Sequence, residues 1–198
     1  MSNQVETYIE VKLEDRDQIT GLFRYILIVP VLIFSAAFAP GMKEYWSVGI
    51  GIVVLPTLLA VVFRGVYPSY AYNFNRALIE LTTRISAYAL LLNDNYPSIE
   101  GNSSVRVIFP DVDGGKKLNR LLPLVKWLLA IPLYIVGVVY SVYALIMLIL
   151  GWFSIIFTKD LPQVVGEVLF GVTRYWNRVL GYAFLLVTDE YPSFNLKD

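Results

Sequence analysis

The sequence contains no cysteine and no histidine. The lack of cysteine excludes disulfides and thiol nucleophiles, and the lack of histidine excludes imidazole general bases and most zinc, copper and haem sites. Hydrolysis of the Ser-His type is excluded for the same reason. We therefore predict a non-enzymatic protein with no catalytic residues, no bound metal and no cofactor.

Charge is also scarce. Charged residues make up 16% of the chain and hydrophobic residues 57%, whereas soluble domains average about 25% and about 45–50%. The 16 basic and 16 acidic residues cancel, so the net charge does not indicate a nucleic-acid partner. No basic region precedes an apolar core at the N-terminus, and no cleaved signal peptide is expected. This composition predicts an integral membrane protein whose partners are membrane lipids.

The longest uncharged stretch runs from Trp127 to Thr158. One crossing of a bilayer takes about 20 apolar residues, so the stretch is too long for one helix and slightly short for two. We interpret it as a tight transmembrane hairpin over residues 121–157. A first hairpin is predicted over residues 22–63, with Pro40 and Gly41 at its turn.

Each predicted hairpin is followed by a segment in which charges return at helical spacing. Residues 68–92 and 162–187 are therefore predicted to form cytoplasmic amphipathic helices that lie in the membrane interface with their apolar side down. Each hairpin is preceded by a short alternating segment, Tyr8–Leu13 or Val105–Phe109, which is typical of a strand. Short strands cannot stand alone, so these two should pair with each other, with the segment around Phe194, or with a neighbouring subunit.

This order of elements occurs twice along the chain. Residues of matching type and spacing recur in the two halves: Phe23–Pro30 as Val125–Pro132, Asp94 as Asp189, Tyr96 as Tyr191, and Pro97 as Pro192. The pattern predicts two tandem parallel repeats, residues 1–100 and 101–198. The predicted fold class is all-α integral membrane, with four transmembrane helices and a little β structure.

Basic residues are unevenly distributed around the predicted spans. Lys43 alone lies on the far side of the two hairpins, and the other 15 of the 16 basic residues lie on the near side. By the positive-inside rule, both termini then face the cytoplasm. We expect a multi-pass protein of the inner (cytoplasmic) membrane, in a homo-oligomer or a larger membrane protein complex.

Arg24 and Lys126 lie at the membrane end of the first helix of each predicted hairpin. A long basic side chain at that depth can extend to lipid phosphate groups, so both residues are candidates for head-group contacts. Ordinary anchoring at the interface is the commoner explanation for such residues.

Three more arginines, Arg84, Arg174 and Arg178, lie on the polar sides of the two amphipathic segments and are candidates for anion contacts. Arg174 and Arg178 are four residues apart and repel each other unless an anion or a carboxylate lies between them. A solvated polar face is the commoner explanation. A third interpretation makes residues 161–187 a true span, in which Glu167 pairs with Arg178.

Pro30, Pro56 and Pro132 fall inside the predicted spans, where we expect them to kink the helices. A carbonyl freed by proline could also bind an ion, but no acidic residue lies within any span to hold a cation. The repeated Asp-x-Tyr-Pro-Ser motif fits a turn at the membrane boundary. Neither of its serines has a base beside it, which argues against a nucleophile.

Several runs of residues in the second half carry a resemblance to a known family: Leu122–Pro132, Trp152–Phe153, Phe157–Thr158, Tyr175–Val179, Tyr182–Leu186 and Asp189–Phe194. This half resembles the bacterial membrane family catalogued as domain of unknown function 4389. The resemblance covers about residues 104 to 196 closely, and the first half is similar to a diverged copy, with Tyr25 and Thr82 in place of Trp127 and Trp176. It implies an integral membrane location and carries no established activity.

The sequence leaves two functions open. The first is a lipid-contacting scaffold or accessory subunit of a membrane complex. It would also shape the membrane, because each leg of the second hairpin is shorter than the hydrocarbon thickness of about 30 Å. The alternative is an oligomeric transporter or pore for lipid or small ions. The predicted spans contain few polar residues to line such a path, which argues against it.

Overall fold

The computed structural model describes residues 3–36, 54–100 and 103–197. The elements in this part of the chain are β1 (Glu6–Ile9), α1 (Gln18–Leu27), α2 (Val29–Ala36), α3 (Leu55–Leu59), the π-helical turn η1 (Ala60–Arg64), α4 (Ser69–Ala89), β2 (Val105–Ile108), the 3-10 turn η2 (Asp113–Gly115), α5 (Pro123–Leu129), α6 (Ile131–Thr158) and α7 (Gln163–Ala183). The fold is mostly helical, as the apolar and amphipathic segments predict, with one two-stranded sheet.

Helix α6 is continuous through Val138, where the predicted hairpin over residues 121–157 would have turned. That prediction is wrong because it rested on length alone. Between Pro132 and Thr158 the sequence has no proline, asparagine or aspartate, and an isolated glycine costs a helix only about 1 kcal/mol. The chain reverses only after α6, where Lys159 adopts a left-handed conformation with φ of 63°.

The two glycines of α6 serve helix packing instead of a turn. A Cβ atom on Gly137 would lie 2.7 Å from the Trp176 ring, and one on Gly151 would lie 2.8 Å from Leu161. Both contacts are with α7 or the turn before it, so the missing side chains allow α6 and α7 to approach closely along their length. The turn of the first predicted hairpin, with Pro40 and Gly41, lies outside the described residues.

Strands β1 and β2 pair with each other in an antiparallel register that places Thr7 opposite Val107. This confirms the first of the three predicted pairings, although β1 begins earlier than the predicted segment Tyr8–Leu13. Along β2, Val105 and Val107 are buried while Arg106 and Ile108 face outward. The alternation gives the sheet one face on the core and one exposed outer face.

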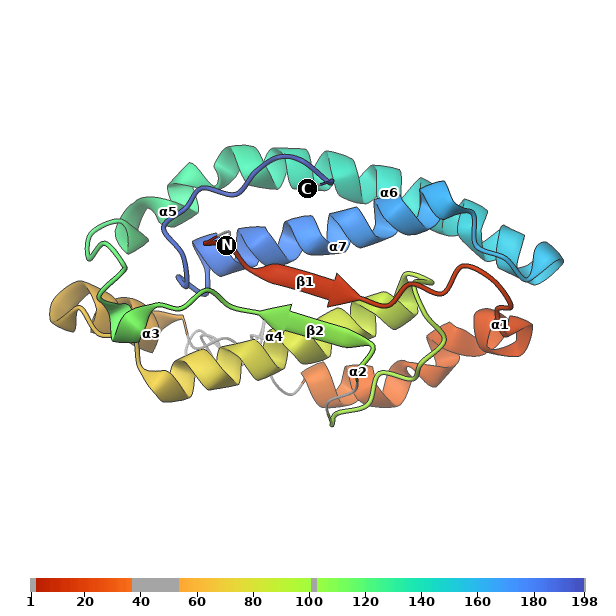
Figure 1. Cartoon of the computed structure of the whole chain (residues 1–198), viewed down its shortest axis with the longest axis horizontal. Coiled ribbons are helices and arrows are strands. Elements are labelled where there is room, and N and C mark those ends of the chain that lie inside the picture. The colour runs from red at the N-terminus through yellow and green to blue at the C-terminus, as the bar shows by residue number, and fades with distance from the viewer. Residues whose placement is uncertain (1–2, 37–53, 101–102, 198) are drawn as a thin grey trace.

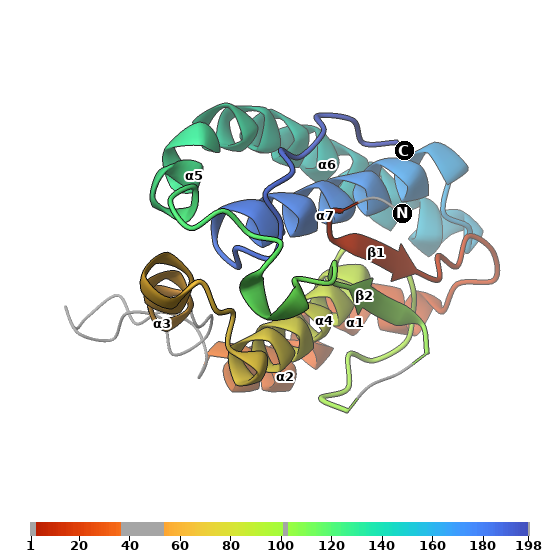
Figure 2. The ribbon, with the colours of Figure 1, turned by 60° about the vertical axis from the view of Figure 1, so that its left-hand side comes forward.

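The sheet and the helices form two layers. In Figure 1 the strands lie in front of the helices, and the strands and long helices run roughly along the same axis. Helices α6 and α7 lie on one side of the sheet in this view, and α4 lies on the other with α1 and α2 beyond it. Figure 2 shows the sheet on one side of the molecule and α3 on the opposite side.

Helices α4 and α7 are amphipathic as predicted, but protein covers their apolar sides. Ile79 of α4 packs with Val107 and Leu185 beneath the sheet. Leu169 of α7 packs with Ile155 in a second cluster. Neither helix turns its apolar side to a bilayer, because the sheet and the neighbouring helices occupy that side.

Hydrogen bonds connect the two halves of the chain. The Tyr67 amide donates to the Gly114 carbonyl at 2.8 Å, and the Leu161 amide donates to the Leu13 carbonyl at 2.7 Å. Between α4 and α7, the Asn177 side-chain amide donates to the Thr83 hydroxyl at 3.0 Å. Strand pairing and these contacts make one interlocked unit from residues far apart in the sequence.

The loop at Gly114 and Gly115 offers a matched pair of variants that tests this closure. Both glycines have positive φ, but a Cβ on Gly115 would lie 2.6 Å from the Tyr67 amide nitrogen, whereas one on Gly114 meets nothing within 4 Å. We expect Gly115→Ala to lower the free energy of unfolding by about 2–5 kcal/mol, from backbone strain plus overlap with backbone. Gly114→Ala should cost about 1–2 kcal/mol. Equal losses, measured by chemical unfolding, would contradict the close approach.

Candidate functional site

Asp94 is the centre of a buried cluster of charge. Its carboxylate lies 2.9 Å from Arg16 Nη2, 3.0 Å from Arg24 Nη2 and 3.6 Å from Lys12 Nζ. The Arg16 and Arg24 side chains are fully buried, and Lys12 is half exposed. Burial lowers the pKa of Arg16, and the charge of Asp94 opposes that shift. One carboxylate therefore compensates two guanidinium groups that have no access to water.

Arg24 is further held by the helix that precedes Asp94. Its Nη1 donates to the carbonyl of Tyr88, and its guanidinium lies 4.8 Å from the centre of the Tyr88 ring. The other carboxylate oxygen of Asp94 accepts from the amide of Asp17, the residue that caps α1. The cluster thus joins the start of α1 to the end of α4.

Lys126 forms the corresponding arrangement in the second half of the chain. Its Nζ lies 2.7 Å from Asp189 Oδ1, donates to the Thr188 carbonyl at 2.6 Å, and lies 5.3 Å from the centre of the Tyr182 ring. The other Asp189 oxygen accepts from the amide of Asn119, whose side chain in turn accepts from the amides of Leu121 and Leu122 just before α5. Here one lysine balances one carboxylate.

These positions correct the prediction for Arg24 and Lys126. Both side chains are completely buried and bonded to protein oxygens, so neither extends to a lipid head group. The physical reason is that a cation inside an apolar layer is cheapest when a carboxylate and hydrogen-bond acceptors surround it. One pattern in the sequence could have indicated these pairs: a basic residue and an aspartate occur together in both halves, as Arg24 with Asp94 and as Lys126 with Asp189.

The three arginines of the amphipathic helices hold the segments that follow those helices. Arg84 donates to the Ile99 carbonyl at 3.3 Å, and Arg178 donates to the Ser193 hydroxyl at 3.0 Å. Arg174 donates to the Leu196 carbonyl and lies 5.3 Å from the centre of the Phe170 ring. Arg84 and Arg178 are buried, so a fully solvated polar face does not describe them.

Arg174 and Arg178 also line a cavity of about 490 Å³ beside β1, together with Glu190 and Glu6. Oxygen atoms of the C-terminal segment accept hydrogen bonds from both arginines, from Arg174 at Leu196 and from Arg178 at Ser193 and Asn195, in the role that the sequence analysis assigned to an anion. The alternative pair of Glu167 with Arg178 is not formed, because Glu167 lies 2.6 Å from Lys197 at the surface.

The Asp-x-Tyr-Pro motif occupies the same kind of turn in both halves. Tyr96 packs edge-on against Tyr88 at 6.1 Å between ring centres, and Tyr191 packs against Tyr182 at 5.5 Å. The prolines that follow, Pro97 and Pro192, are both buried. The aspartate of each motif is the carboxylate that binds Arg24 or Lys126, which the sequence reasoning missed.

The three prolines predicted to kink spans lie at helix starts. Pro30, Pro56 and Pro132 are each the second residue of a helix: α2, α3 and α6 respectively. At that position proline forfeits no intrahelical hydrogen bond. Within the described ranges 3–36, 54–100 and 103–197, no three acidic residues come together as a candidate metal site.

Two buried tyrosines give the fold an alkaline limit. Burial raises the pKa of Tyr67 and of Tyr175 to about 12, and their hydroxyls donate to the carbonyls of Leu185 and Leu133 at 2.6 and 2.7 Å. Because the folded pKa lies above the ordinary 10.0, this stabilisation is complete below pH 10 and lost as the pH rises from 10 to about 12. In that window we expect phenolate absorbance to rise while the helical circular dichroism signal falls. Titration of all 14 tyrosines near pH 10 in the folded state would contradict it.

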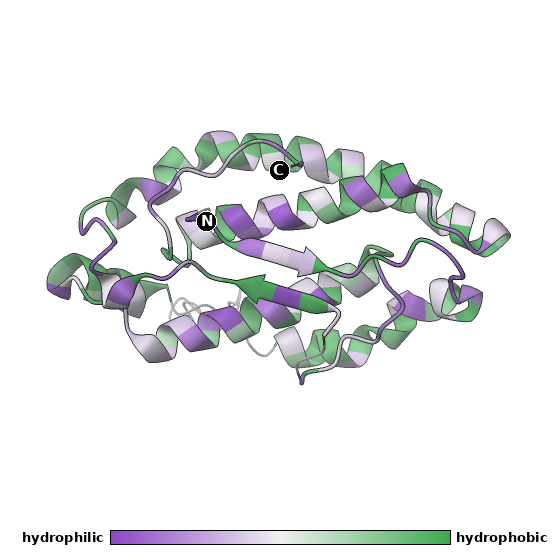
Figure 3. Ribbon diagram, in the orientation of Figure 1, coloured by the Kyte–Doolittle hydropathy of each residue, from purple (hydrophilic) through white to green (hydrophobic). Residues whose placement is uncertain are grey.

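An apolar belt covers the outer sides of α1, α2, α5 and α6. Its most exposed members are Ile19, Leu22, Ile26 and Ile33 on α1 and α2, Trp127 and Leu128 on α5, and Ile135, Val138, Val139, Val142, Leu145, Ile146, Leu150 and Phe157 on α6. Figure 3 shows apolar residues along the whole of α6. The only charged residues of these four helices, Arg24 and Lys126, are buried, so the belt carries no charge.

The belt and the fold together define a class of protein. Residues Gln18–Ala36 and Ile131–Thr158 form helices long and apolar enough to cross a membrane, by length and composition. The chain is therefore a mostly helical protein with membrane-compatible helices.

Residues 122–195 match the family model described as Domain of unknown function (DUF4389). This range extends from just before α5 through α7 to the segment that Arg178 holds. It agrees with the resemblance of the second half, and the match covers less than half of the chain. No curated protein and no solved structure matches the chain.

Proposed function

We propose that this is a non-catalytic inner-membrane protein that embeds in lipid through the apolar belt. It acts as a scaffold or accessory subunit of a membrane complex, as a homo-oligomer or with other chains. The observation that carries the proposal is the absence of any exposed charge on α1, α2, α5 and α6. Contiguous apolar surface of this extent marks an interaction site, and an uncharged helical surface fits hydrocarbon.

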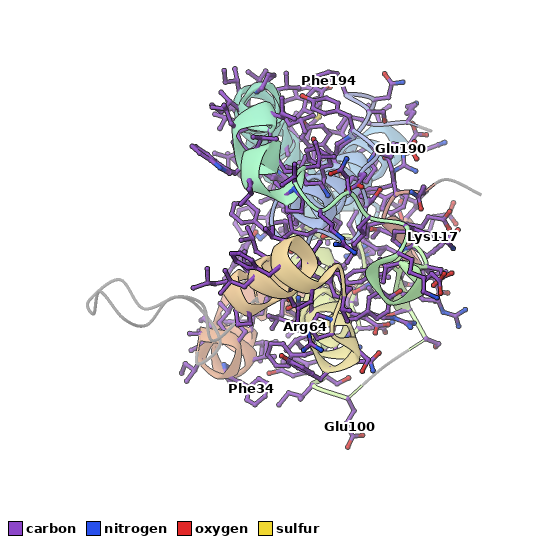
Figure 4. The ribbon with its side chains drawn as sticks, turned by 90° about the vertical axis from the view of Figure 1, so that its left-hand side faces the viewer. Phe34, Arg64, Glu100, Lys117, Glu190 and Phe194 are labelled. Carbon is purple, nitrogen blue, oxygen red and sulfur yellow. The ribbon has the colours of Figure 1, made fainter. Side chains whose placement is uncertain are left out.

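The layered fold favours helices that lie along the bilayer. Lys117 and Glu190 lie on the sheet side of the molecule, and Phe34 of α2 lies on the opposite side (Figure 4). The sheet layer runs parallel to α6, so a crossing α6 would carry that layer's exposed charges, such as Arg106, through the hydrocarbon. Each charge at the bilayer centre costs about 2.5–3.5 kcal/mol or more. A flat orientation avoids this cost.

This orientation supports a role in shaping the membrane. Helix α6 has 28 residues and is therefore about 42 Å long. A rod of that length inserted in one leaflet, with polar protein above it, enlarges that leaflet relative to the other. Short hairpin legs do not contribute to this shaping, because α6 is one continuous helix.

We also infer that the chain is a duplicated unit with both termini in the cytoplasm. The paired arrangements of Arg24 with Asp94 and Lys126 with Asp189 support the duplication. In the described part of the chain, every basic residue except the buried Arg24 and Lys126 lies outside α1, α2, α5 and α6, which supports the cytoplasmic side.

Matched lysine substitutions on the two faces test the embedding. Ile146, on α6, is 53% exposed, and Ile108, on the outer face of the sheet, is 39% exposed. We expect Ile146→Lys to weaken flotation of the protein with liposomes, and Ile108→Lys to leave it unchanged. Equal flotation of both variants and the parent would contradict the proposal.

Reconstitution tests the functional part. At high protein density we expect smaller or tubular vesicles and no ion conductance. Unchanged vesicle size would remove membrane shaping, and measurable flux would favour the pore alternative.

A further inference from the structure

A cleft of about 360 Å³ lies between α4, α6 and α7. Its volume is at the lower end of the range for small-molecule sites, about 300–1,000 Å³. Four hydroxyl side chains contribute to its lining: Thr82, Ser86, Ser141 and Thr173.

The hydroxyls offer acceptors to the cleft. Thr82 donates to the Ile79 carbonyl at 3.0 Å, Thr173 to Leu169 at 2.9 Å, and Ser141 to Gly137 at 2.8 Å. Each of these protons is used within its own helix, and a hydroxyl oxygen has two lone pairs. Ser141 accepts one bond, from the Trp176 indole N–H at 3.0 Å, and has a second lone pair. The cleft therefore suits a ligand that donates a hydrogen bond.

Apart from Asn177, whose side-chain amide donates to the Thr7 and Thr83 hydroxyls, the remaining walls are apolar and reach the apolar belt. Leu145 lines the cleft and is also 57% exposed as a member of the belt on α6. The cleft thus opens beside the surface that we place in lipid, and a molecule dissolved in the bilayer can enter it without crossing water. No charged side chain lines it, so it offers no partner to a phosphate or a carboxylate.

We propose that this cleft binds one single-chain lipid whose neutral head carries a hydroxyl or amide hydrogen-bond donor. The chain lies against Leu145 and its apolar neighbours, and the head donates to the oxygen of Ser141 or Thr82. The inference rests on the proposed membrane embedding, and its test is separate from the flotation assay.

Native mass spectrometry of the full chain released from detergent micelles tests the site. The probes are octadecanol, which has a donor, and methyl octadecanoate, which has none. We expect one octadecanol per protein and about two- to tenfold weaker retention of the ester, which is the value of one hydrogen bond. Ser141→Ala and Thr82→Val together should lower octadecanol retention to the level of the ester without changing the ester.

A second variant tests the site by filling the cleft with a larger side chain. Ser86→Phe places a ring in the cleft and should abolish retention of both probes, whereas Ser35→Phe, on α2 away from the cleft, should not. Near-UV circular dichroism identifies variants that fail to fold. Equal binding of the two probes, or octadecanol retained by a folded Ser86→Phe, would overturn the proposal. A parent protein that floats with liposomes but binds no octadecanol would overturn the lipid site and leave the proposed function standing.

Discussion

The Asp94→Asn variant is expected to lose at least about 3–5 kcal/mol of stability, the cost of breaking a buried ion pair. In the parent protein the Asp94 carboxylate is the common partner of Arg16 and Arg24, whose side chains are fully buried. An amide in its place leaves two guanidinium groups next to each other with no anion. At about 2–4 °C per kcal/mol for a chain of this size, thermal unfolding in detergent should fall by about 6–20 °C.

Two matched carboxylates set the scale for that loss. Asp189→Asn strands a single buried cation, Lys126, and should cost less than Asp94→Asn. The exposed pair of Asp111 and Lys117 has a similar separation, 2.7 Å, and Asp111→Asn should leave the unfolding temperature unchanged. Adding Lys126→Met to Asp189→Asn should restore most of the loss, since the charge is then removed with its partner. Similar melting temperatures for all three single variants would refute the cluster.

Residues 1–100 and 101–198, produced as separate chains, are expected to fold only together. β1 and the loop at Leu13 contribute contacts to the second half, and β2 and Gly114 contribute contacts to the first. The first half alone therefore has β1 without its partner strand and the Tyr67 amide without its carbonyl acceptor. The second half alone has β2 without its partner strand and the Leu161 amide without its acceptor. Co-expressed halves should copurify as a one-to-one complex with native circular dichroism, and each half alone should aggregate.

The halves experiment carries its own control. Gly115→Ala in the second half should weaken recovery of the complex, because a Cβ there overlaps the Tyr67 backbone, and Gly114→Ala should weaken it less. Independent folding of either half as a stable monomer would show that the interlocked contacts are dispensable.

Local patterns in the sequence predicted most of the helices. The return of charge at helical spacing gave the amphipathic helices within a few residues of α4 (Ser69–Ala89) and α7 (Gln163–Ala183). The alternation at Val105–Phe109 gave β2. These patterns predict helices and strands correctly because the periodicity of apolar residues depends only on the segment itself and on which of its sides is buried.

The predictions that were wrong or incomplete depended on contacts between distant residues or on an assumed membrane. The hairpin within α6 came from comparing segment length with bilayer thickness, and turn-forming residues were absent. Arg24 and Asp94 are 70 residues apart, and no local pattern pairs them. The pairing of β1 with β2 from opposite halves was one of three options, which the strand sequences alone could not rank.

Three positions on one face of α6 test the central claim that the helix lies along the bilayer within lipid. Ile135, Ile146 and Phe157 are all exposed and are spaced 11 residues apart, about three helical turns or 16 Å per step. The chain has no native cysteine, so each can be replaced singly by cysteine and spin-labelled in liposomes. We expect all three labels to collide with oxygen more than with a water-soluble nickel reagent, and to report equal depth. A deep label at 146 with shallow labels at 135 and 157 would show a crossing helix, and three water-accessible labels would show that the belt does not enter lipid.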